Sequence, residues 1–128
     1  MNAITLGADP ELFFKRGDQF ISAIGKVGGS KARPRKIGNG FAVQEDNVSV
    51  EYNIPPGDAD NFVVSNMYML GYLKHLAESY NCELAMGAAS AVFSDEELDH
   101  PMAHASACRS TLVCSRRSVA VVEAGLAV

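Results

Sequence analysis

The sequence of 128 residues has no long apolar run, no internal repeat and no N-terminal targeting pattern. A membrane-spanning helix needs about 20 consecutive apolar residues, and no stretch approaches that length. The N-terminus has neither the basic head nor the long apolar core of a signal peptide. No segment recurs at a fixed period, which excludes a repeat architecture. These absences predict a cytoplasmic protein that makes no use of a membrane.

Cysteine and histidine are few, and neither has the spacing of a metal site. Three cysteines are an odd number without close pairs, so the sequence predicts neither a disulfide framework nor a zinc site. His100 and His104 are four residues apart, but Pro101 intervenes and no glutamate is placed as in the metalloprotease motif. A histidine-based metal site is therefore not expected. The cysteines are Cys82, Cys108 and Cys114.

The charge balance argues against a protein that binds nucleic acid. Lysine and arginine total 11 against 15 acidic residues, for a net charge of −4. The basic residues cluster only in 26–36 and 109–117, which is too little for a nucleic-acid surface. A composition of 48% hydrophobic and 20% charged residues is typical of one soluble globular domain with a buried core.

Acidic residues are concentrated in the stretch 42–56, AVQEDNVSVEYNIPP. The residues of 47–53 alternate between apolar and polar, which predicts a strand with one core face and one polar face. Glu51 lies on the polar face, and Glu45 and Asp46 directly precede the strand. Two prolines then end the strand because they have no N–H group to donate.

A second acidic pair lies near the N-terminus, where Asp9 and Glu11 share one side of a predicted strand in GADPELFF. One interpretation of these acids is the solvated face or edge of an antiparallel sheet. The other is a site for a hard cation, because Mg²⁺ prefers carboxylate oxygens. The second interpretation has a geometric requirement. Asp46 and Glu51 have opposite parity, so a bulge or turn at 45–47 must bring both to one face.

The segment 25–40 is rich in glycine and lysine and predicts a surface loop. Its exposed amides, with Lys26 and Lys31, would suit phosphate or carboxylate oxygens. The segment lacks the GxxxxGK[ST] spacing of a nucleotide-binding loop, and a loop with solvated lysines is the alternative.

The remaining patterns predict an α+β fold in which a helix covers one face of a mixed or antiparallel sheet of three to five strands. The helix begins at Asp58 or Asp60, runs to about Tyr80 and carries an apolar stripe with a period of 3.6 residues. Gly71 lies on its outer face, where the missing side chain permits close approach of another group. A short helix starts at Ser94 and stops near Pro101. The apolar stripe of the long helix consists of Phe62, Met69, Leu70, Leu73, Leu76, Ala77 and Tyr80. Further predicted strands are 3–8, 12–14, 19–24, 82–86 and 119–122.

The order and spacing of four segments resemble the start of the phage carboxylate–amine ligases of type 2, in the glutamate–cysteine ligase and glutamine synthetase superfamily. These segments are GADPELFF, ISAIGKVGGSK, GFAVQEDNVSVEYNIPP and DEELDHP. The resemblance covers about residues 4–107. It implies a curved, mainly antiparallel sheet and an ATP-dependent enzyme that joins a carboxylate to an amine with the help of Mg²⁺. A phage-encoded protein of this kind would act in the host cytoplasm.

The resemblance also implies roles for individual residues. Glu11 and Glu51 correspond to magnesium ligands, and Glu45 is a further candidate ligand. Asp46 corresponds to the base that takes a proton from the incoming amine. Such ligases first phosphorylate the carboxylate, because its own oxide is a poor leaving group, and the amine then attacks the acyl phosphate. Lys26 and Lys31 are the candidate contacts to ATP or to the substrate carboxylate.

The chain departs from the family after residue 107. Family members continue into a second half that supplies much of the nucleotide site, whereas 108–128 matches nothing in them. We therefore expect an N-terminal ligase-like part in 1–107, incomplete relative to the family fold, and a divergent tail in 108–128. Two hypotheses follow. The chain is half of a ligase completed by a second chain or by a homo-oligomer, or it is an inactive binding module that offers its open sheet edge to a partner.

Overall fold

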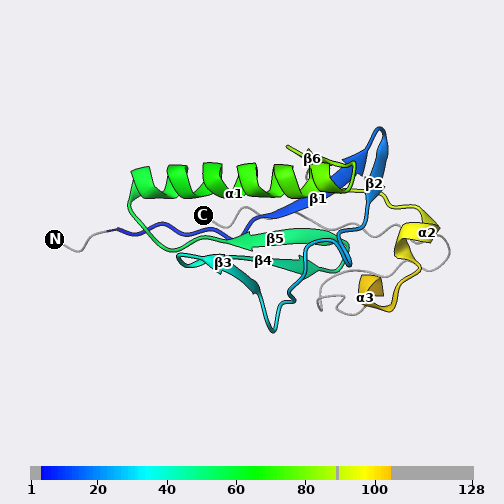
Figure 1. The fold of residues 1–128 in the computed structure, drawn as a ribbon, viewed down its shortest axis with the longest axis horizontal. Helices are drawn as coiled ribbons and strands as arrows, with labels where there is room; N and C mark the ends of the chain where they lie inside the picture. The colour runs from blue at the N-terminus through cyan, green and yellow to red at the C-terminus, as the bar shows by residue number, and fades with distance from the viewer. Residues whose placement is uncertain (1–3, 89, 105–128) are drawn as a thin grey trace.

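The computed structural model describes residues 4–88 and 90–104, in which one long helix lies over an antiparallel sheet (Figure 1). The sheet curls into a half-barrel, so the predicted α+β class is confirmed. The predictions about Cys108, Cys114, strand 119–122 and the tail 108–128 lie outside the described residues. The strands are β1 (Glu11–Arg16), β2 (Gln19–Ile21), β3 (Arg35–Gly38), β4 (Phe41–Asp46), β5 (Ser49–Asn53) and β6 (Glu83–Ala85).

The strands pair in the order β2-β1-β5-β4-β3, and β6 joins the far half of β1. Every pairing between these strands is antiparallel. Tight turns connect three of the pairs. Asn39 and Asn47 take left-handed backbone conformations in the β3–β4 and β4–β5 turns, with φ of 52° and 54°. Asparagine tolerates this conformation better than most residues, which explains its place in both turns.

Helix α1 (Ala59–Ser79) covers one face of the sheet. The side chain of Asp58 caps it by accepting a hydrogen bond from the amide of Asn61, as predicted for one of two candidate caps. Met69, Leu73 and Ala77 are buried against the sheet. Phe62, Leu70 and Leu76 are partly buried against the same core, so six of the seven predicted stripe residues are confirmed. Tyr80 is the exception: it is the C-cap that follows the last helical residue, and it is 38% exposed.

Each face of the sheet carries its own core. Phe14 belongs to the core beneath α1, and Phe13, its neighbour on β1, belongs to a second core on the other face. This division follows from the alternation of side chains along a strand. The second core is closed by the segment after β6, which includes the short helices α2 (Asp95–Leu98) and α3 (Pro101–His104). The side chain of Ser94 caps α2 as the sequence predicts.

Several predicted strand limits are wrong. The described part of 3–8 forms only an isolated bridge between Leu6 and Gly57, and β1 begins after Pro10, which cannot donate to a ladder. The predicted loop 25–40 contains β3, because β4 supplies a partner that local composition does not reveal. The sheet therefore has six strands rather than three to five. Segment 82–86 is a strand only over β6, and the 19–24 hairpin with β1 is confirmed, shortened to β2.

Candidate metal centre

Three carboxylates from three strands meet on the face of the sheet that α1 does not cover. Glu11 on β1 pairs with Glu51 on β5, and Glu51 pairs on its other side with Gln44 on β4. Asp46 follows Gln44 by two residues, so it faces the same way. One oxygen each of Glu11, Asp46 and Glu51 lies within 4.8 Å of the others. These three residues are the carboxylate cluster.

The turn between β4 and β5 provides the geometry that the sequence requires. Asn47 has a φ of 54°, and the chain reverses there so that Asp46 pairs with Ser49. The Ser49 hydroxyl donates a 2.7 Å hydrogen bond to the backbone oxygen of Asp46 and so holds the turn. Asp46 and Glu51 have opposite parity along the chain but lie on one face because they belong to two antiparallel strands. A turn thus brings both residues to one face, as the sequence requires, but it lies at 47–48 rather than 45–47, because residues 45 and 46 still belong to β4. The predicted strand 47–53 accordingly begins only at Ser49.

Burial places the cluster in an environment that disfavours its own negative charge. Glu51 is 5% exposed and Asp46 is 9% exposed. Burial, then the charges of Asp46 and Glu51, raise the pKa of Glu11 from 4.5 to about 7. Burial also raises the pKa of Glu51, although a hydrogen bond with Gln44 and the charge of Lys31 oppose that shift. A cation bound among these oxygens would relieve the repulsion, so the cluster is suited to one.

Lys31 is the one cation among the described residues that contacts the cluster. Its Nζ donates a 3.1 Å hydrogen bond to Oδ2 of Asp46. That hydrogen bond and the charge of Asp46 raise the pKa of Lys31. The lysine side chain is 71% exposed, so it can leave Asp46 at little cost when another cation arrives.

The structure does not bring every predicted site residue to the cluster. Glu45 points to the other face of β4, where Oε1 accepts hydrogen bonds from the amides of Val27 and Gly28 at 3.2 and 2.8 Å. Glu45 and Asp46 are adjacent on β4, so their side chains point to opposite faces of the sheet. Glu45 therefore anchors the 25–40 segment and does not join the cluster. Lys26 donates a 2.8 Å hydrogen bond to the backbone oxygen of Ser22. Of the predicted set, Glu11, Asp46, Glu51 and Lys31 come together, whereas Glu45 and Lys26 do not.

Gln44 is a site residue that the sequence interpretation missed. It is 3% exposed, and its side chain bonds Glu51 in the same row of the sheet. Parity along β4 was the available signal, because Gln44 precedes Asp46 by two residues and must share its face. Asp9 is exposed, yet its charge contributes to the raised pKa of Glu51. It therefore lies near the rim of the cluster, as its spacing from Glu11 suggests.

The raised pKa of Glu11 predicts that the metal-free protein becomes less stable as pH rises. A carboxyl with a higher pKa in the folded state contributes stability that is complete below about pH 4.5 and is lost as pH rises through about 7. Urea unfolding with a chelator present should therefore show a falling free energy of unfolding over this range. Glu11→Gln should flatten that dependence, whereas Glu96→Gln, at an exposed position, should preserve it. An unchanged slope in Glu11→Gln would contradict the prediction.

Comparison of the chain with protein-family models, curated proteins and solved structures found no match. None of the helices among residues 4–88 and 90–104 combines the length and apolar character that crossing a membrane requires.

Proposed function

We propose that this chain is part of an ATP- and Mg²⁺-dependent ligase that joins a carboxylate to an amine. The observation that carries the proposal is the carboxylate cluster, in which Glu11, Asp46 and Glu51 converge from three neighbouring strands beside Lys31. Hard carboxylate oxygens are the ligands that Mg²⁺ prefers, and the ion is usually held by one or two of them together with substrate phosphates. The donor set therefore fits magnesium.

The residues divide into roles that suit the two chemical stages of such a ligase. Glu11 and Glu51, paired across β1 and β5, would hold Mg²⁺, which neutralises charge on the phosphoryl group during transfer. Asp46 would accept a proton from the incoming amine, which can attack the acyl phosphate only in its neutral form. The contact between Lys31 and Asp46 supports this role, because it is a hydrogen bond between a primary ammonium and the proposed base.

Lys31 would act in the first stage. Its exposed ammonium group is near enough to the cluster to contact a phosphate or the substrate carboxylate once the lysine leaves Asp46. Lys26 is proposed only as a more distant contact, since its ammonium group bonds the backbone of Ser22. The face around the cluster provides three strands of a site, and a second chain or a second copy would supply further contacts to the nucleotide.

Calorimetry tests this proposal directly. The full chain should bind ATP with a Kd of about 1–100 μM in the presence of Mg²⁺ and not in its absence. Glu11→Gln and Glu51→Gln should each weaken that binding by about tenfold or more, because each removes a carboxylate from the ion. Glu96→Gln is the matched control, as an exposed acid on α2 away from the cluster. Equal binding by all four proteins, or none by a cooperatively folded wild type, would refute the ligase assignment.

A non-catalytic binding module is the second candidate. The observation that favours it is the position of β6, which pairs with β1 and has no second strand partner among the described residues. Unpaired strand edges readily recruit another chain. A stable dimer that forms without metal and shows no ATP binding would favour this function over the ligase.

A further inference from the structure

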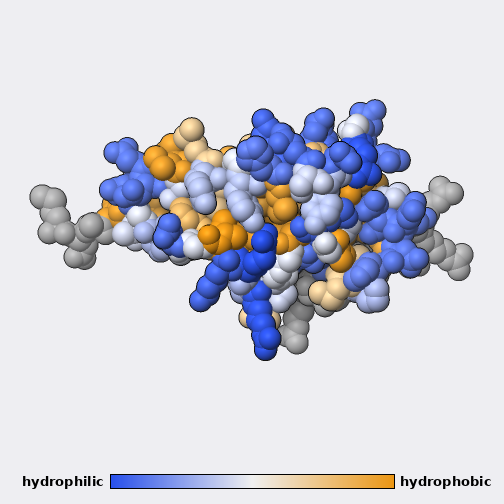
Figure 2. All heavy atoms as spheres, in the orientation of Figure 1, coloured by the Kyte–Doolittle hydropathy of each residue, from blue (hydrophilic) through white to orange (hydrophobic). Residues whose placement is uncertain are grey.

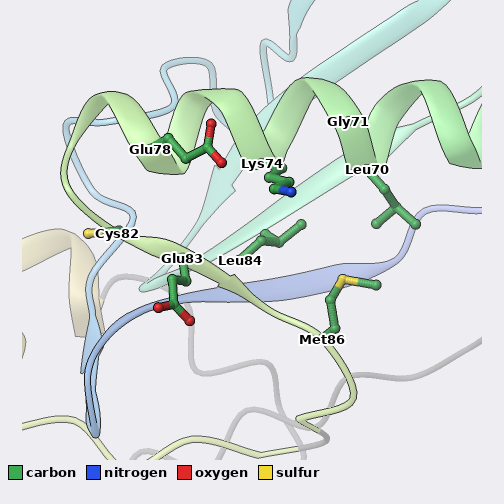
Figure 3. A pocket seen from close by; sticks show the side chains of 8 residues that line it. All are labelled: Leu70, Gly71, Lys74, Glu78, Cys82, Glu83, Leu84 and Met86. Atoms are coloured by element: carbon green, nitrogen blue, oxygen red, sulfur yellow. The ribbon is translucent and has the colours of Figure 1, made fainter.

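A cavity lies between α1 and β6, away from the carboxylate cluster. It has a volume of about 490 Å³. Figure 3 shows Leu70 and Lys74 extending from the helix toward Leu84 on β6, with Met86 just beyond the strand. We call this space the α1–β6 groove. It lies on the helix-covered side of the sheet, so the proposed ligase chemistry does not use it.

The groove has an open strand edge as one wall. Within 4–88 and 90–104, β6 has β1 as its single strand partner, so its outer edge offers backbone groups to another strand. Met86 continues this wall and is 63% exposed. An exposed apolar side chain next to an unpaired edge is typical of a surface that a partner covers.

The helix wall has a gap in its surface at Gly71. A Cβ at this position would meet no described residue within 4 Å, so packing among those residues does not require a glycine here. Glycine in the interior of a helix costs roughly 0.5–1 kcal/mol relative to alanine. The same side of α1 continues toward its N-terminus with apolar residues that are more than half exposed, and Figure 2 shows the apolar surface at that end of the helix. These residues are Val63, Val64 and Met67.

The charges in the groove are self-complementary. Lys74 and Glu78 both line it and stand one helical turn apart on α1. If a second α1 lies antiparallel beside the first, with the two-fold axis between these positions, Lys74 of each copy faces Glu78 of the other. A two-fold interface repeats each contact, so one arrangement forms two ion pairs. The same two-fold axis places β6 of one copy antiparallel to β6 of the other. Two antiparallel edges can then exchange backbone hydrogen bonds.

We propose that the α1–β6 groove is a homodimer interface, in which a second copy of this chain extends the sheet at β6 and packs its α1 antiparallel against the first. The edge of β6 that is unpaired among the described residues provides backbone hydrogen bonds, and Lys74 with Glu78 sets the register of the two helices. The interface is independent of the carboxylate cluster, so it can exist whether or not the chain is a ligase.

Charge reversal gives a sharp test, measured by sedimentation equilibrium on the full chain at pH 8. Within one copy, Oε2 of Glu78 lies 3.3 Å from Nδ1 of His75, so the charge variants are read against the wild type at the same pH. The wild type should form a dimer of twice 13.7 kDa as its concentration rises. Lys74→Glu should weaken the dimer about tenfold or more because it opposes acid to acid twice, and Glu78→Lys should do the same by opposing lysines.

The mixed sample then distinguishes this interface from any other. An equimolar mixture of Lys74→Glu and Glu78→Lys should restore dimers, since each copy then presents the charge that the other lacks. The double variant carrying both changes should also dimerise by itself. Lys36→Glu and Glu96→Lys are matched controls at exposed positions outside the groove and should dimerise like the wild type. A monomeric wild type, or a mixture that stays monomeric, would overturn the proposal.

Hydrogen exchange provides a second readout on the strand edge. The amides of β6 should exchange more slowly in the wild-type dimer than in Lys74→Glu at the same concentration. If the wild type dimerises but its β6 amides exchange as fast as those of Lys74→Glu, the contact lies elsewhere and the proposed interface is wrong. Both measurements omit ATP and Mg²⁺, so their failure is separate from a failure of the proposed ligase function.

Discussion

Replacing Gly29 with alanine is expected to lower the free energy of unfolding by about 2–5 kcal/mol, from a left-handed backbone and a steric overlap together. Gly29 has a φ of +78°, and a Cβ there would lie 2.5 Å from the backbone nitrogen of Arg35 and 2.8 Å from the backbone oxygen of Val43. These two residues are paired between β3 and β4. Neither backbone can move without disturbing that pairing, so the overlap cannot be relieved cheaply.

The comparison with Gly25→Ala isolates the steric part of this effect. Gly25 has a similar φ of +76°, but a Cβ there would meet nothing within 4 Å. Its replacement should cost only the conformational term of about 1–2 kcal/mol. Urea unfolding of both variants measures the difference. Equal losses in the two variants would show that the close packing of Gly29 against β3 and β4 contributes nothing.

The same substitution should reach the carboxylate cluster. The carbonyl of Gly29 accepts a long hydrogen bond, 3.5 Å, from the amide of Glu45, and Lys31 follows two residues later. Moving this loop would draw Lys31 away from Asp46, to which it is hydrogen-bonded. The functional loop and the β3–β4 pair are therefore parts of one packed unit.

Phe13→Ala is expected to produce a loss of similar size, about 3–5 kcal/mol, because it empties the centre of the second core. Phe13 is 0% exposed. Its ring lies 5.9 Å from that of Phe20 and 6.1 Å from that of Phe93, both edge to face. Since small domains have a total stability of only about 5–15 kcal/mol, the variant should be close to unfolding at 37 °C.

Phe41→Ala is the control for the loss of an aromatic ring from a less buried place. Phe41 is half-buried and packs on Tyr68 at 5.0 Å on the α1 side of the sheet. Its removal should cost less, about 1–2 kcal/mol. Thermal and urea unfolding measure both. A loss below about 1 kcal/mol in Phe13→Ala would mean that the segment after β6 collapses into the space.

Phe13 also connects the core to the candidate site. Glu11 precedes it by two residues on β1 and so shares its face. Phe13, which packs on Phe20 and Phe93, therefore neighbours Glu11 on one face of β1. Loosening this packing should let water reach Glu11 and lower its raised pKa toward the ordinary value, because burial is the main cause of that shift.

Local patterns predicted helix α1 and its cap because both depend on neighbours within a few residues. The 3.6-residue stripe with Met69, Leu73 and Ala77 and the capping side chain of Asp58 are confirmed. Strand limits were less predictable. Segment 25–40 looks like a loop by composition, yet β3 forms in it because β4 lies alongside.

The candidate site was predicted in part, and the misses at Glu45 and Gln44 have one cause. Glu45 and Asp46 are adjacent in the sequence, and on a strand adjacent side chains face opposite ways. Only Asp46 reaches the cluster, while Glu45 holds the amides of Val27 and Gly28. Gln44 was missed for the same reason, although it shares the face of Asp46. Parity alone could have separated these residues once β4 was known to be a strand.

The sequence by itself determined the α+β class, the capped amphipathic helix and the need for a turn before Glu51, because each follows from short-range periodicity and turn chemistry. Only the tertiary structure decided that Glu11 lies opposite Glu51 and that β6 has one strand partner, β1, among the described residues. Both depend on which distant strands pair with β1. Pairing across long sequence separations is set by how whole faces pack together, and no local pattern encodes that choice.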